Sequence, residues 1–423
     1  MNRDKQKYKW HIKIHREGEE IPSFFASHGI PEELARILMH RRIDSAEKLS
    51  HFLYDNLDHL SDPFLMKGMD KAVSRILQAI DQQEKIVVYG DYDVDGITST
   101  SIMMRCLSSL GADVGYYIPQ REKEGYGLNR EAVNHLAEEG YHLLITVDCG
   151  ISSAALISEA PKGLDIIVTD HHTPPELLPS CVAVLNPHQK DCPYPYKELA
   201  GCGVAYTLCR GLYMKRLGRD YDGTVELAAL GTIADVVSLT GEDRILVKEG
   251  MKRFIHTPIK GLAALLKASG IVHDDTTEIR RADQVSFGLA PRLNAAGRIA
   301  RASEGVRLMT TESAEEAERL AQKLCEINTM RQQIERDIFE QANSRMAELG
   351  IENDMAVVVD GKDWHPGVIG IVASRILESC HRPVFVITVR DGIGKGSCRS
   401  IPAFNIYKAL SAQSDILLQF GGH

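Results

Sequence analysis

The sequence predicts an α/β protein, in which a doubly wound parallel sheet is joined by a long helix to a second, smaller α/β domain. Short apolar runs of strand length recur between residues 86 and 185, with amphipathic helical runs between them. A long helical stripe follows, and after it come two further runs of strand type. The first pattern indicates the parallel sheet, and the other two indicate the connecting helix and the second domain.

The order of these patterns divides the chain into four regions. Residues 1–80 form a helical preface whose basic and acidic clusters alternate, and residues 81–245 form the sheet domain. Residues 246–350 form a helical region that contains the connecting helix, and residues 351–423 form the second domain. Within the sheet domain, a helix from Asn129 to Glu139 begins at an asparagine cap. Strands are expected to begin near Ile86, Val114, Leu143, Ile166 and Ala183.

The connecting helix is expected to run from Thr311 to about Leu349 and to end at Gly350. At 1.5 Å per residue it would reach roughly 50 Å. A coiled-coil arm is the alternative interpretation. The strands expected at 356–359 and 384–388 favour an α/β domain at the far end of the helix. Its apolar stripe contains Ala317, Leu320, Leu324, Ile327, Ile334, Ile338 and Ala342.

Composition indicates an ordinary globular protein, with 44% hydrophobic and 25% charged residues. The net charge of -9 excludes a basic surface as the source of nucleic-acid binding, which would need a local groove. Nine cysteines occur without a Cys-x-x-Cys pair, and Cys149 and Cys398 are expected to serve as small residues within motifs. The amino terminus lacks the apolar segment of a signal peptide, and no stretch is long enough to cross a membrane. We therefore expect a reduced, cytoplasmic protein.

The strand that begins at Ile86 is followed directly by Asp91, Asp93 and Asp95. Carboxylates this close together resist ionisation unless a cation neutralises them, so the run indicates a metal site. An EF-hand loop is excluded, because Ile102 stands where the closing glutamate belongs and a strand precedes the loop. The nucleophile motif of haloacid-dehalogenase-like phosphatases remains open. A solvated acidic turn would explain one aspartate better than three.

Three further segments are interpreted as apolar strands with polar residues at their carboxyl ends: residues 143–150, 166–172 and 230–235. Parallel strands gather ligands at this edge of a sheet, so segments distant in sequence can build one site. Taken singly, Asp148 could be a helix cap, His172 a core histidine and Asp235 a charge at a helix end. The side chains expected to come together are Asp91, Asp93, Asp95, Asp148, His171 and Asp235. Carboxylates with one imidazole suit manganese or magnesium, and the histidine favours manganese.

The string Asp170-His171-His172 resembles the motif that gives the DHH phosphoesterase superfamily its name. The strings 91–96, 147–150 and 231–236 are shared across that superfamily. The strings 290–298 and 364–370 are similar to the RecJ branch, and the likeness continues through 397–400 and 421–423. This resemblance covers nearly the whole chain. It implies a 5′ to 3′ exonuclease that acts on single-stranded DNA in recombination and repair.

The resemblance also implies two divalent ions, with Mn²⁺ preferred and Mg²⁺ possible. Asp148 would bridge the ions and Asp93 would hold the first, while the second would be held by Asp95, His171 and Asp235. Asp91 would be a ligand or a neighbour of one, and His172 would touch the scissile phosphate or orient its neighbour. A pocket for the 5′-phosphate is implied at Arg121, Arg298 or Arg292, Ser397, Arg399 and His423. Family partners would be single-strand-binding protein and a RecQ-type helicase.

Two other functions remain as alternatives. One is a DHH phosphodiesterase that acts on short oligonucleotides or cyclic dinucleotides, and the other is a non-catalytic replication scaffold. The long helix and the string 290–298 argue against the first, and the complete set of expected ligands argues against the second. In relatives the Gly-Gly-His string lies inside the second domain. We therefore expect this chain to end within that domain and to bind long single strands weakly.

Overall fold

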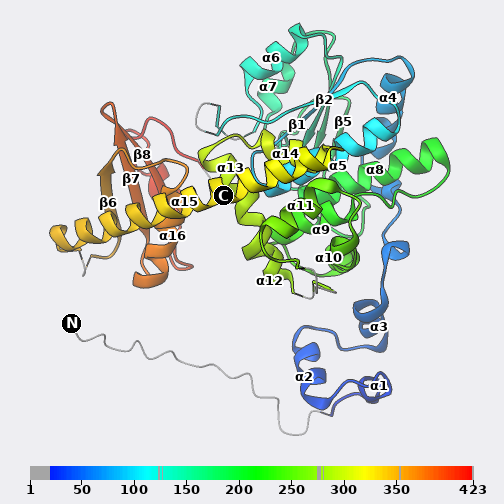
Figure 1. Cartoon of the computed structure of the whole chain (residues 1–423), viewed down its shortest axis with the longest axis horizontal. Helices are drawn as coiled ribbons and strands as arrows, with labels where there is room; N and C mark the ends of the chain where they lie inside the picture. The colour runs from blue at the N-terminus through cyan, green and yellow to red at the C-terminus, as the bar shows by residue number, and fades with distance from the viewer. Residues whose placement is uncertain are drawn as a thin grey trace. The chain divides into compact units, whose positions relative to one another are not determined.

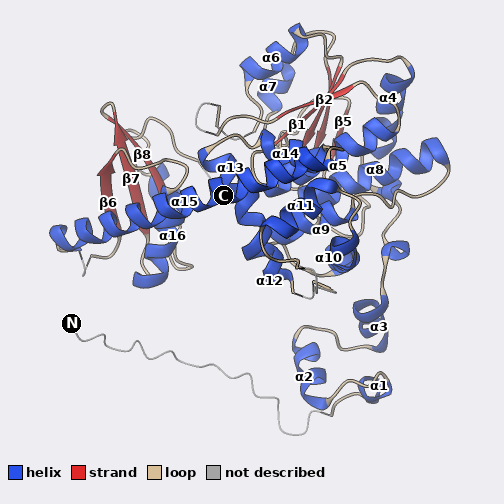
Figure 2. Cartoon of the chain, in the orientation of Figure 1, coloured by secondary structure: helices blue, strands red, loops and turns tan. Residues whose placement is uncertain are grey.

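The computed structural model describes residues 20–121, 124–125, 127–273, 278–279, 281–351 and 354–421. The chain divides into two compact units, Met1–His59 and Leu60–His423. The course of the chain is coloured in Figure 1, and its helices and strands are coloured in Figure 2. All of the expected catalytic and binding residues belong to the second unit, so the first is described only briefly.

The first unit is a small helical body within its described residues. Its core is formed by Phe25, Ala35 and Leu49, one from each α-helix. Ser45 caps the third helix, because its side chain accepts a hydrogen bond from the backbone N–H of Lys48 at 3.1 Å. The elements are α1 (Ser23–Ser27), α2 (Glu32–His40), α3 (Ala46–Tyr54) and the 3₁₀ turn η1 (Leu57–His59).

The second unit contains, among its described residues, a five-stranded sheet in the order β2-β1-β3-β4-β5. Every neighbouring pair in this sheet is parallel, which confirms the predicted doubly wound sheet. The order reverses direction between β1 and β3, and such a switch point is where open α/β sheets bind ligands. The strands are β1 (Ile86–Gly90), β2 (Val114–Tyr117), β3 (Leu143–Val147), β4 (Asp165–Thr169) and β5 (Ala183–Leu185).

Helices cover both faces of this sheet. On one face, α6 and α7 pack Val133, Leu136 and Ile157 against the strand residues Val87 and Leu144. On the other face, α5 and α8 pack against each other and against β1 and β3. The helix predicted at Asn129 is confirmed, and the Asn129 side chain accepts a hydrogen bond from the N–H of Ala132. These helices are α5 (Val94–Ser109), α6 (Arg130–Glu138), α7 (Ala154–Ser158) and α8 (Gly201–Leu217).

Helix α4 (Met69–Asp81) begins the second unit, together with the 3₁₀ turn η2 (Pro63–Leu65). Its helical spacing was predicted correctly within the preface. However, α4 packs on α8 and β5, because Met69, Val73 and Ile76 are buried on that side. The compact preface therefore ends at His59.

The strand predicted at residues 230–235 is wrong, because this segment lies in helix α9 (Val225–Ala234). The helix is buried on every side, so its sequence shows no polar face and no helical periodicity. A short apolar run of this kind cannot be assigned to a strand or a helix from periodicity alone. Its two alanines and two leucines at 227–230 favour the helix. Asp235 is thus the C-cap of a helix rather than the end of a strand.

The long connecting helix is confirmed as α15 (Ala314–Leu349), which has 36 residues. Ser313 caps its amino end, and Gly350 ends it in a left-handed conformation with φ of 66°. Its first half packs on α11, α13 and α14, and its second half packs on β6 and α16. The predicted stripe therefore faces two cores, and the coiled-coil alternative fails.

The second domain carries a three-stranded sheet in its described part, in the order β6-β7-β8. The strands β6 and β7 were predicted, whereas the exposed β8 was not, because its glycines and lysine lack the pattern of a strand. Ile338 and Ala342 of α15 pack with Val357, Val372 and the other core residues of this domain. The elements are β6 (Val357–Lys362), α16 (Ile369–Cys380), β7 (Val384–Arg390), β8 (Ile393–Arg399) and α17 (Ile406–Ser411).

The region between the sheet domain and α15 is helical, as predicted. Helix α10 packs closely on α9, and α13 packs on α15. The π-helical turn η4 runs directly into α13, which carries the string 290–298. The elements are α10 (Gly241–Arg253), η3 (Phe254–His256), α11 (Lys260–Ala268), α12 (Ala282–Gln284), η4 (Val285–Leu289), α13 (Ala290–Ile299) and α14 (Ser303–Thr310).

Candidate active site

The three aspartates that follow β1 take up different structural positions. Asp91 comes first after the strand and is buried, with 2% of its surface exposed. Asp93 is the N-cap of α5, and its Oδ1 accepts a hydrogen bond from the backbone N–H of Gly96 at 3.0 Å. Asp95 lies in the first turn of α5, where the helix dipole stabilises negative charge. The alternating spacing thus places one carboxylate in the loop and two at a helix start.

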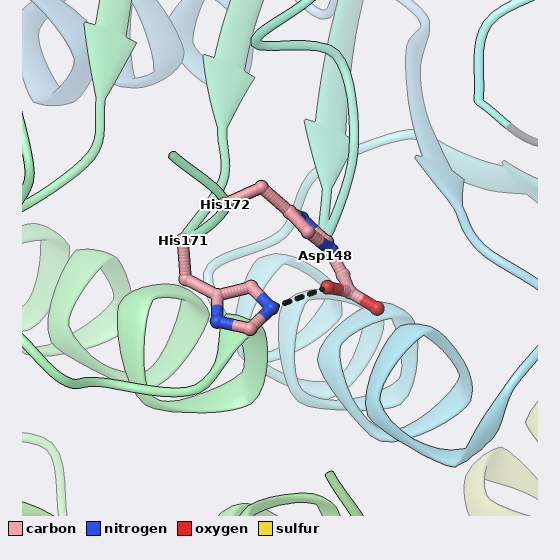
Figure 3. Close-up of side chains that lie close together, drawn as sticks. All are labelled: Asp148, His171 and His172. Atoms are coloured by element: carbon pink, nitrogen blue, oxygen red, sulfur yellow. Dashed lines mark ion pairs between the residues drawn. The ribbon is translucent and has the colours of Figure 1, made fainter. Parts of the chain in front are cut away.

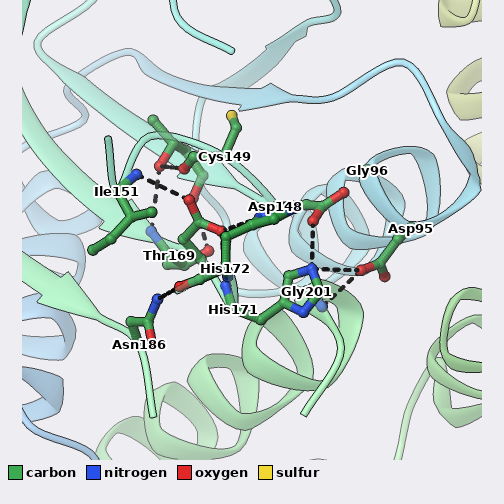
Figure 4. Close-up of polar contacts among 12 residues, drawn as sticks. Asp95, Gly96, Asp148, Cys149, Ile151, Thr169, His171, His172, Asn186 and Gly201 are labelled. Carbon is green, nitrogen blue, oxygen red and sulfur yellow. Dashed lines mark hydrogen bonds and ion pairs between the residues drawn. The ribbon is translucent and has the colours of Figure 1, made fainter. Parts of the chain in front are cut away.

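Asp95 is held by a second helix start. Its Oδ2 accepts a hydrogen bond from the N–H of Gly201 at 2.7 Å, and its Oδ1 accepts one from the N–H of Cys202 at 2.8 Å. Both donors belong to the first turn of α8 (Figure 4). A Cβ atom on Gly201 would lie 2.8 Å from both Asp148 Oδ1 and Asp95 Oδ2. Only a glycine lets the helix start approach the two carboxylates this closely.

Asp148 follows β3 in a left-handed conformation, with φ of 59°. Aspartate is one of the few residues that tolerate this conformation. Its carboxylate is almost fully buried, and its Oδ1 lies 3.2 Å from His171 Nε2 (Figure 3). The Asp148 carboxylate therefore points across the sheet edge toward the residues that follow β4.

The Asp170-His171-His172 string is organised by the buried carboxylate of Asp170. Its Oδ1 accepts hydrogen bonds from the backbone N–H groups of His171 and His172, at 2.8 and 3.1 Å, and lies 2.7 Å from His172 Nδ1. Its Oδ2 accepts a hydrogen bond from the N–H of Ile151 at 2.9 Å. Asn186 donates a hydrogen bond to the carbonyl oxygen of His172 at 2.9 Å (Figure 4). Asp170 thus fixes both histidines, a role that was not predicted from the sequence.

Asp235 completes the set from the end of α9. His171 Nε2 lies 3.8 Å from Asp235 Oδ2 and 3.9 Å from Asp95 Oδ2. The predicted metal residues therefore meet in three overlapping groups, each with ligand atoms within 4.8 Å of one another. The groups are Asp91, Asp93 and Asp148; Asp148, His171 and His172; and Asp95, His171 and Asp235.

Burial and mutual repulsion raise the pKa values of several carboxyl groups here. Burial raises the pKa of Asp148 well above its usual range, and the charges of Asp95 and Asp93 raise it further. Burial and the same two charges raise the pKa of Asp235 to about 8. Burial also raises the pKa of Asp91, and the neighbouring charge of Asp93 adds to this shift. These carboxylates cannot all be ionised at neutral pH without a compensating cation.

The pKa values of the two histidines shift in opposite directions. Burial lowers the pKa of His171, which outweighs the nearby charge of Asp95 and favours the neutral imidazole that metals bind. Burial also opposes protonation of His172, but the hydrogen bond and charge of Asp170 outweigh it and raise the pKa of His172. Burial would raise the pKa of Asp170, yet its hydrogen bonds with His172 lower it. His171 is therefore suited to a metal, and His172 to a phosphate.

The donor set fits hard divalent cations. Asp91 Oδ1 is buried and has no hydrogen-bond partner within the described residues, which is costly unless an ion satisfies it. The groups contain carboxylate oxygens and imidazole but no cysteine, which suits manganese or magnesium rather than a structural zinc site. The residues present thus fit the expected metals.

A pocket of about 220 Å³ opens beside the first metal group. It shares Asp91 and Asp93 with that group and adds Arg121 and Arg298 on its other side. The Arg121 guanidinium lies 5.0 Å from the centre of the Tyr92 ring. Arg298 donates a hydrogen bond to the carbonyl oxygen of Gly367 in the second domain at 3.1 Å. The full lining is Asp91, Tyr92, Asp93, Arg121, Asn294, Gly297 and Arg298.

Two arginines line this pocket, and the charges of two more, Arg331 and Arg399, act on one of them, Arg298. Burial and the positive charges of Arg121, Arg331 and Arg399 lower the pKa of Arg298 to about 10. Arg399, at the end of β8, donates a hydrogen bond to Ser374 Oγ at 2.9 Å. Its Nη1 also lies 3.4 Å from Ser397 Oγ. Converging positive charge of this kind is stabilised by an anion such as phosphate.

Arg292 takes no part in this pocket. It donates hydrogen bonds to Cys325 Sγ at 3.3 Å and to the carbonyl oxygens of Ser269, at 3.4 Å, and Gly288. Of these two arginines, therefore, only Arg298 lines the pocket. His423 lies outside the described residues.

Some residues of the site were not singled out from the sequence. Arg331 was missed because it lies in the middle of α15, where an arginine is usually a surface residue. Its Nη1 pairs with Glu335 at 2.7 Å, and its Nη2 donates a hydrogen bond to Asn328 Oδ1 at 2.6 Å. The sequence did carry one signal, because Asn328 is a polar residue on the buried stripe of α15.

Comparison with known families defines the class of protein to which this fold and site belong. Residues 85–233 match the N-terminal domain of the DHH family, and residues 353–423 match the DHHA1 domain. The first match spans the sheet and all of the predicted metal residues except Asp235. The class is therefore the DHH proteins with a DHHA1 domain, and the haloacid-dehalogenase alternative no longer applies.

The chain belongs to the RecJ family of single-stranded-DNA-specific exonucleases. It is 37% identical to RecJ of Dickeya dadantii over 420 residues, which cover 93% of this chain and 71% of that protein. It is 43% identical to RecJ of Bacillus subtilis over 99% of this chain, but over only 52% of that protein. The chain thus spans about half the length of the Bacillus relative.

A solved structure of exonuclease RecJ bound to manganese shares the fold. Its TM-score is 0.74 at 40% identity, and the match covers 85% of this chain and 88% of that one. This match confirms the α/β architecture with a second, smaller domain.

Among the described helices, none combines the length and apolar character needed to cross a bilayer.

Proposed function

We propose that this chain is the catalytic core of a two-metal exonuclease that degrades single-stranded DNA from its 5′ end and releases 5′-mononucleotides. The metal groups and the arginine pocket form two halves of one site, which we call half-sites. The observation that carries the proposal is that Asp91 and Asp93 belong to both halves. A terminal phosphate held by the arginines would place the next phosphate at the metals. Membership of the RecJ family supports this substrate and a role in recombination and repair.

Two divalent ions are the proposed cofactors, with Mn²⁺ preferred and Mg²⁺ possible. Asp91, Asp93 and Asp148 would hold one ion, and Asp148, Asp95, His171 and Asp235 would hold the other. Asp148 lies between the two sets and is the natural bridge. When bound, such a pair supplies an activated water and neutralises the charge that develops on the phosphate. The manganese-bound relative supports this choice.

His172 would act on the scissile phosphate. Its Nδ1 is held by Asp170, which stabilises the imidazolium and raises the pKa of His172. A hydrogen bond from Nε2 to a phosphate oxygen would orient the phosphate and offset its charge. Asp170 would keep the ring in place through its four hydrogen bonds.

The arginine pocket would set the direction of cleavage. Arg121, Arg298 and Arg399, with Ser397, would bind the terminal 5′-phosphate through paired N–H donors. A 3′ end lacks this phosphate, so the strand would enter in one orientation. The pocket volume of about 220 Å³ is too small for a second nucleotide beyond the phosphate, which favours removal of one nucleotide at each step.

Degradation of a single strand labelled at either end tests the proposal. With Mn²⁺, a 5′ label should appear at once in a mononucleotide, whereas a 3′ label should remain on a ladder of shortening products. A dinucleotide and a cyclic dinucleotide should be cleaved much more slowly. Preferred cleavage of these small substrates would instead support the alternative phosphodiesterase, and the absence of cleavage with every substrate would support a scaffold.

Single-strand-binding protein and a RecQ-type helicase are proposed as partners on family membership alone. We also propose a cytoplasmic location, since all nine cysteines are free thiols.

A further inference from the structure

Val236 has an unusual backbone conformation immediately after the metal residue Asp235. Its φ is 62°, in the left-handed region. A β-branched side chain there clashes with its own backbone, so such residues are true outliers. Strain of this kind persists where function maintains it. In the part of the chain that the structure describes, Val236 is the only aliphatic β-branched residue with a positive φ.

Other helices of this protein end in the same way without strain. α8 ends at Gly218, with φ of 65°, and α15 ends at Gly350, with φ of 66°. Glycine is the usual residue at this position because it has no Cβ atom. The end of α9 could therefore have used glycine, yet it carries valine.

Packing within the chain does not explain the valine. Thr224 is also β-branched with a positive φ of 58°, but it is 7% exposed and its hydroxyl lies 3.1 Å from the hydroxyl of Tyr221. Val236, in contrast, is 81% exposed. Its side chain thus gains little from burial within the chain, and a molecule outside the chain is the remaining candidate to offset its strain.

The position of Val236 relative to the metal groups indicates what that molecule is. The arginine pocket shares Asp91 and Asp93 with the first group, at one end of the row of ligands. Asp235 belongs to the last group, with Asp95 and His171. If the 5′-phosphate lies in the pocket, the strand continues past the scissile phosphate toward the Asp235 end. Val236 directly follows Asp235 in the chain, so it would lie beside the strand on that side of the metal groups.

We propose that Val236 makes an apolar contact with the nucleotide on the 3′ side of the scissile phosphate. This inference rests on the proposed function and adds a substrate contact to it. The methyl groups would pack on the base of that nucleotide, which every DNA sequence offers, so the contact would not discriminate between bases. Leu239, which is 36% exposed, extends the apolar surface along the same segment.

Binding measurements with a non-cleavable strand test this contact. The probe is a 5′-phosphorylated oligonucleotide of roughly 12 nucleotides, whose first linkage is a methylenephosphonate, titrated in Mn²⁺ and followed by anisotropy of a 3′ label. Val236→Gly and the isosteric Val236→Thr should each bind it about three- to tenfold more weakly than the parent. With an abasic second nucleotide, parent and variants should bind alike. Asp191→Gly, which changes an exposed residue with φ of 62°, should match the parent with both probes.

Two further measurements distinguish a direct contact of Val236 with DNA from an indirect effect of Val236 on the position of Asp235. The Val236→Gly protein should melt at or above the temperature of the parent, because its backbone strain is relieved. Its affinity for Mn²⁺, measured by calorimetry, should stay within about twofold of the parent value. A loss of Mn²⁺ affinity would show that Val236 acts through Asp235, and this would overturn the proposed contact.

Equal binding of the intact probe by parent and both variants would also overturn the inference while leaving the proposed function intact. The same loss on the abasic probe as on the intact probe would exclude the base contact. Failure of the parent to bind the intact probe would instead refute the proposed function, and the inference with it.

Discussion

The metal centre and the arginine pocket lie side by side and share two residues, yet the chain builds them in different ways. The metal residues come from residues 91–235, where each follows a strand or caps a helix. The pocket takes Arg121 from the loop after β2 and Arg298 from α13, and the charge of Arg399 from β8 of the second domain acts on Arg298. One half-site is thus carried by local motifs, and the other depends on elements far apart in the sequence.

Each half-site also crowds groups of like charge, which are negative in the metal centre and positive in the arginine pocket. Crowded carboxylates raise the pKa of Asp235 to about 8, and crowded guanidinium groups help burial to lower the pKa of Arg298 to about 10. Each half-site is therefore strained when empty and is relieved by its own ligand, a cation or a phosphate. A substrate strand with a 5′-phosphate would bring anionic charge to both halves at once.

Removal of the Asp148 carboxylate should give the largest effect. It should disrupt the metal centre and leave the arginine pocket intact. Asp148→Ala should lower turnover by roughly 10³-fold or more, because Asp148 joins two of the metal groups. Asp148→Asn should be equally inactive, although asparagine tolerates the left-handed conformation. Turnover and bound Mn²⁺ should be measured for both variants. Near-normal activity with two ions retained would remove the two-metal assignment.

A single methyl group at the start of α8 should give the next largest effect. In Gly201→Ala the new Cβ would lie 2.8 Å from Asp148 and Asp95 atoms, so Mn²⁺ affinity should fall by roughly 10- to 100-fold. Gly203→Ala is the matched control two residues further along the helix, where the Cβ would meet only the flexible side chain of Leu199. Calorimetric titration of Mn²⁺ measures both. Equal affinities would show that the helix start does not position the ligands.

Loss of the Arg399 guanidinium should impair phosphate recognition and leave the metal centre unaffected. Arg399→Ala should weaken the preference for a 5′-phosphate over a 5′-hydroxyl by about tenfold, because charge-assisted hydrogen bonds to phosphate are lost. Its binding of Mn²⁺ should not change. Arg390→Ala is the control, since Arg390 is an exposed arginine at the end of the neighbouring strand β7. If the parent and Arg399→Ala respond equally to the 5′ group, the pocket has been assigned wrongly.

The smallest effect concerns the stability of the metal-free protein. The pKa of Asp235 is about 8 in the folded protein and would be about 4 in the unfolded chain. The folded state thus keeps a proton that the unfolded state releases. This contribution is full below pH of about 4 and is lost as the pH rises through about 8.

Melting temperatures in a chelator should therefore fall between pH of roughly 4 and 8. The fall should be shallower in Asp235→Asn, which cannot ionise at this position. Added Mn²⁺ should restore most of the loss at the alkaline end, because it binds the ionised carboxylates. Parallel curves for the parent and Asp235→Asn would mean that Asp235 does not carry the shift.

The contrast between the half-sites also explains what the sequence could predict. The alternating aspartates after β1 and the string at 170–172 identify the metal centre, because the carboxyl ends of parallel strands must meet. Asp235 does lie close to Asp95 and His171 although its segment was wrongly taken for a strand, since a helix end can deliver a carboxylate to the same edge. Motif and topology were enough here.

The pocket was less predictable because it depends on side-chain packing. Nothing local distinguishes Arg298, which lines the pocket, from Arg292, which lies six residues earlier in α13 and is bound to Gly288 and Cys325. The charge of Arg331 acts on Arg298 only because α15 packs on α13. The direction in which an arginine points along a helix follows from the tertiary contacts of that helix rather than from its neighbours in sequence.

The continuity of α15 has a consequence for how the chain could change in evolution. A helix advances 100° and 1.5 Å with each residue, so its two halves keep a fixed angular phase. One half carries Ala317 and Leu320 into the core beside the sheet domain, and the other carries Ile338 and Ala342 into the core of the second domain. A single inserted residue between them would rotate one core by about 100° relative to the other and turn Arg399 away from Arg298. An insertion of seven residues, close to two full turns, would nearly restore the phase but would separate the two arginines by about 10 Å.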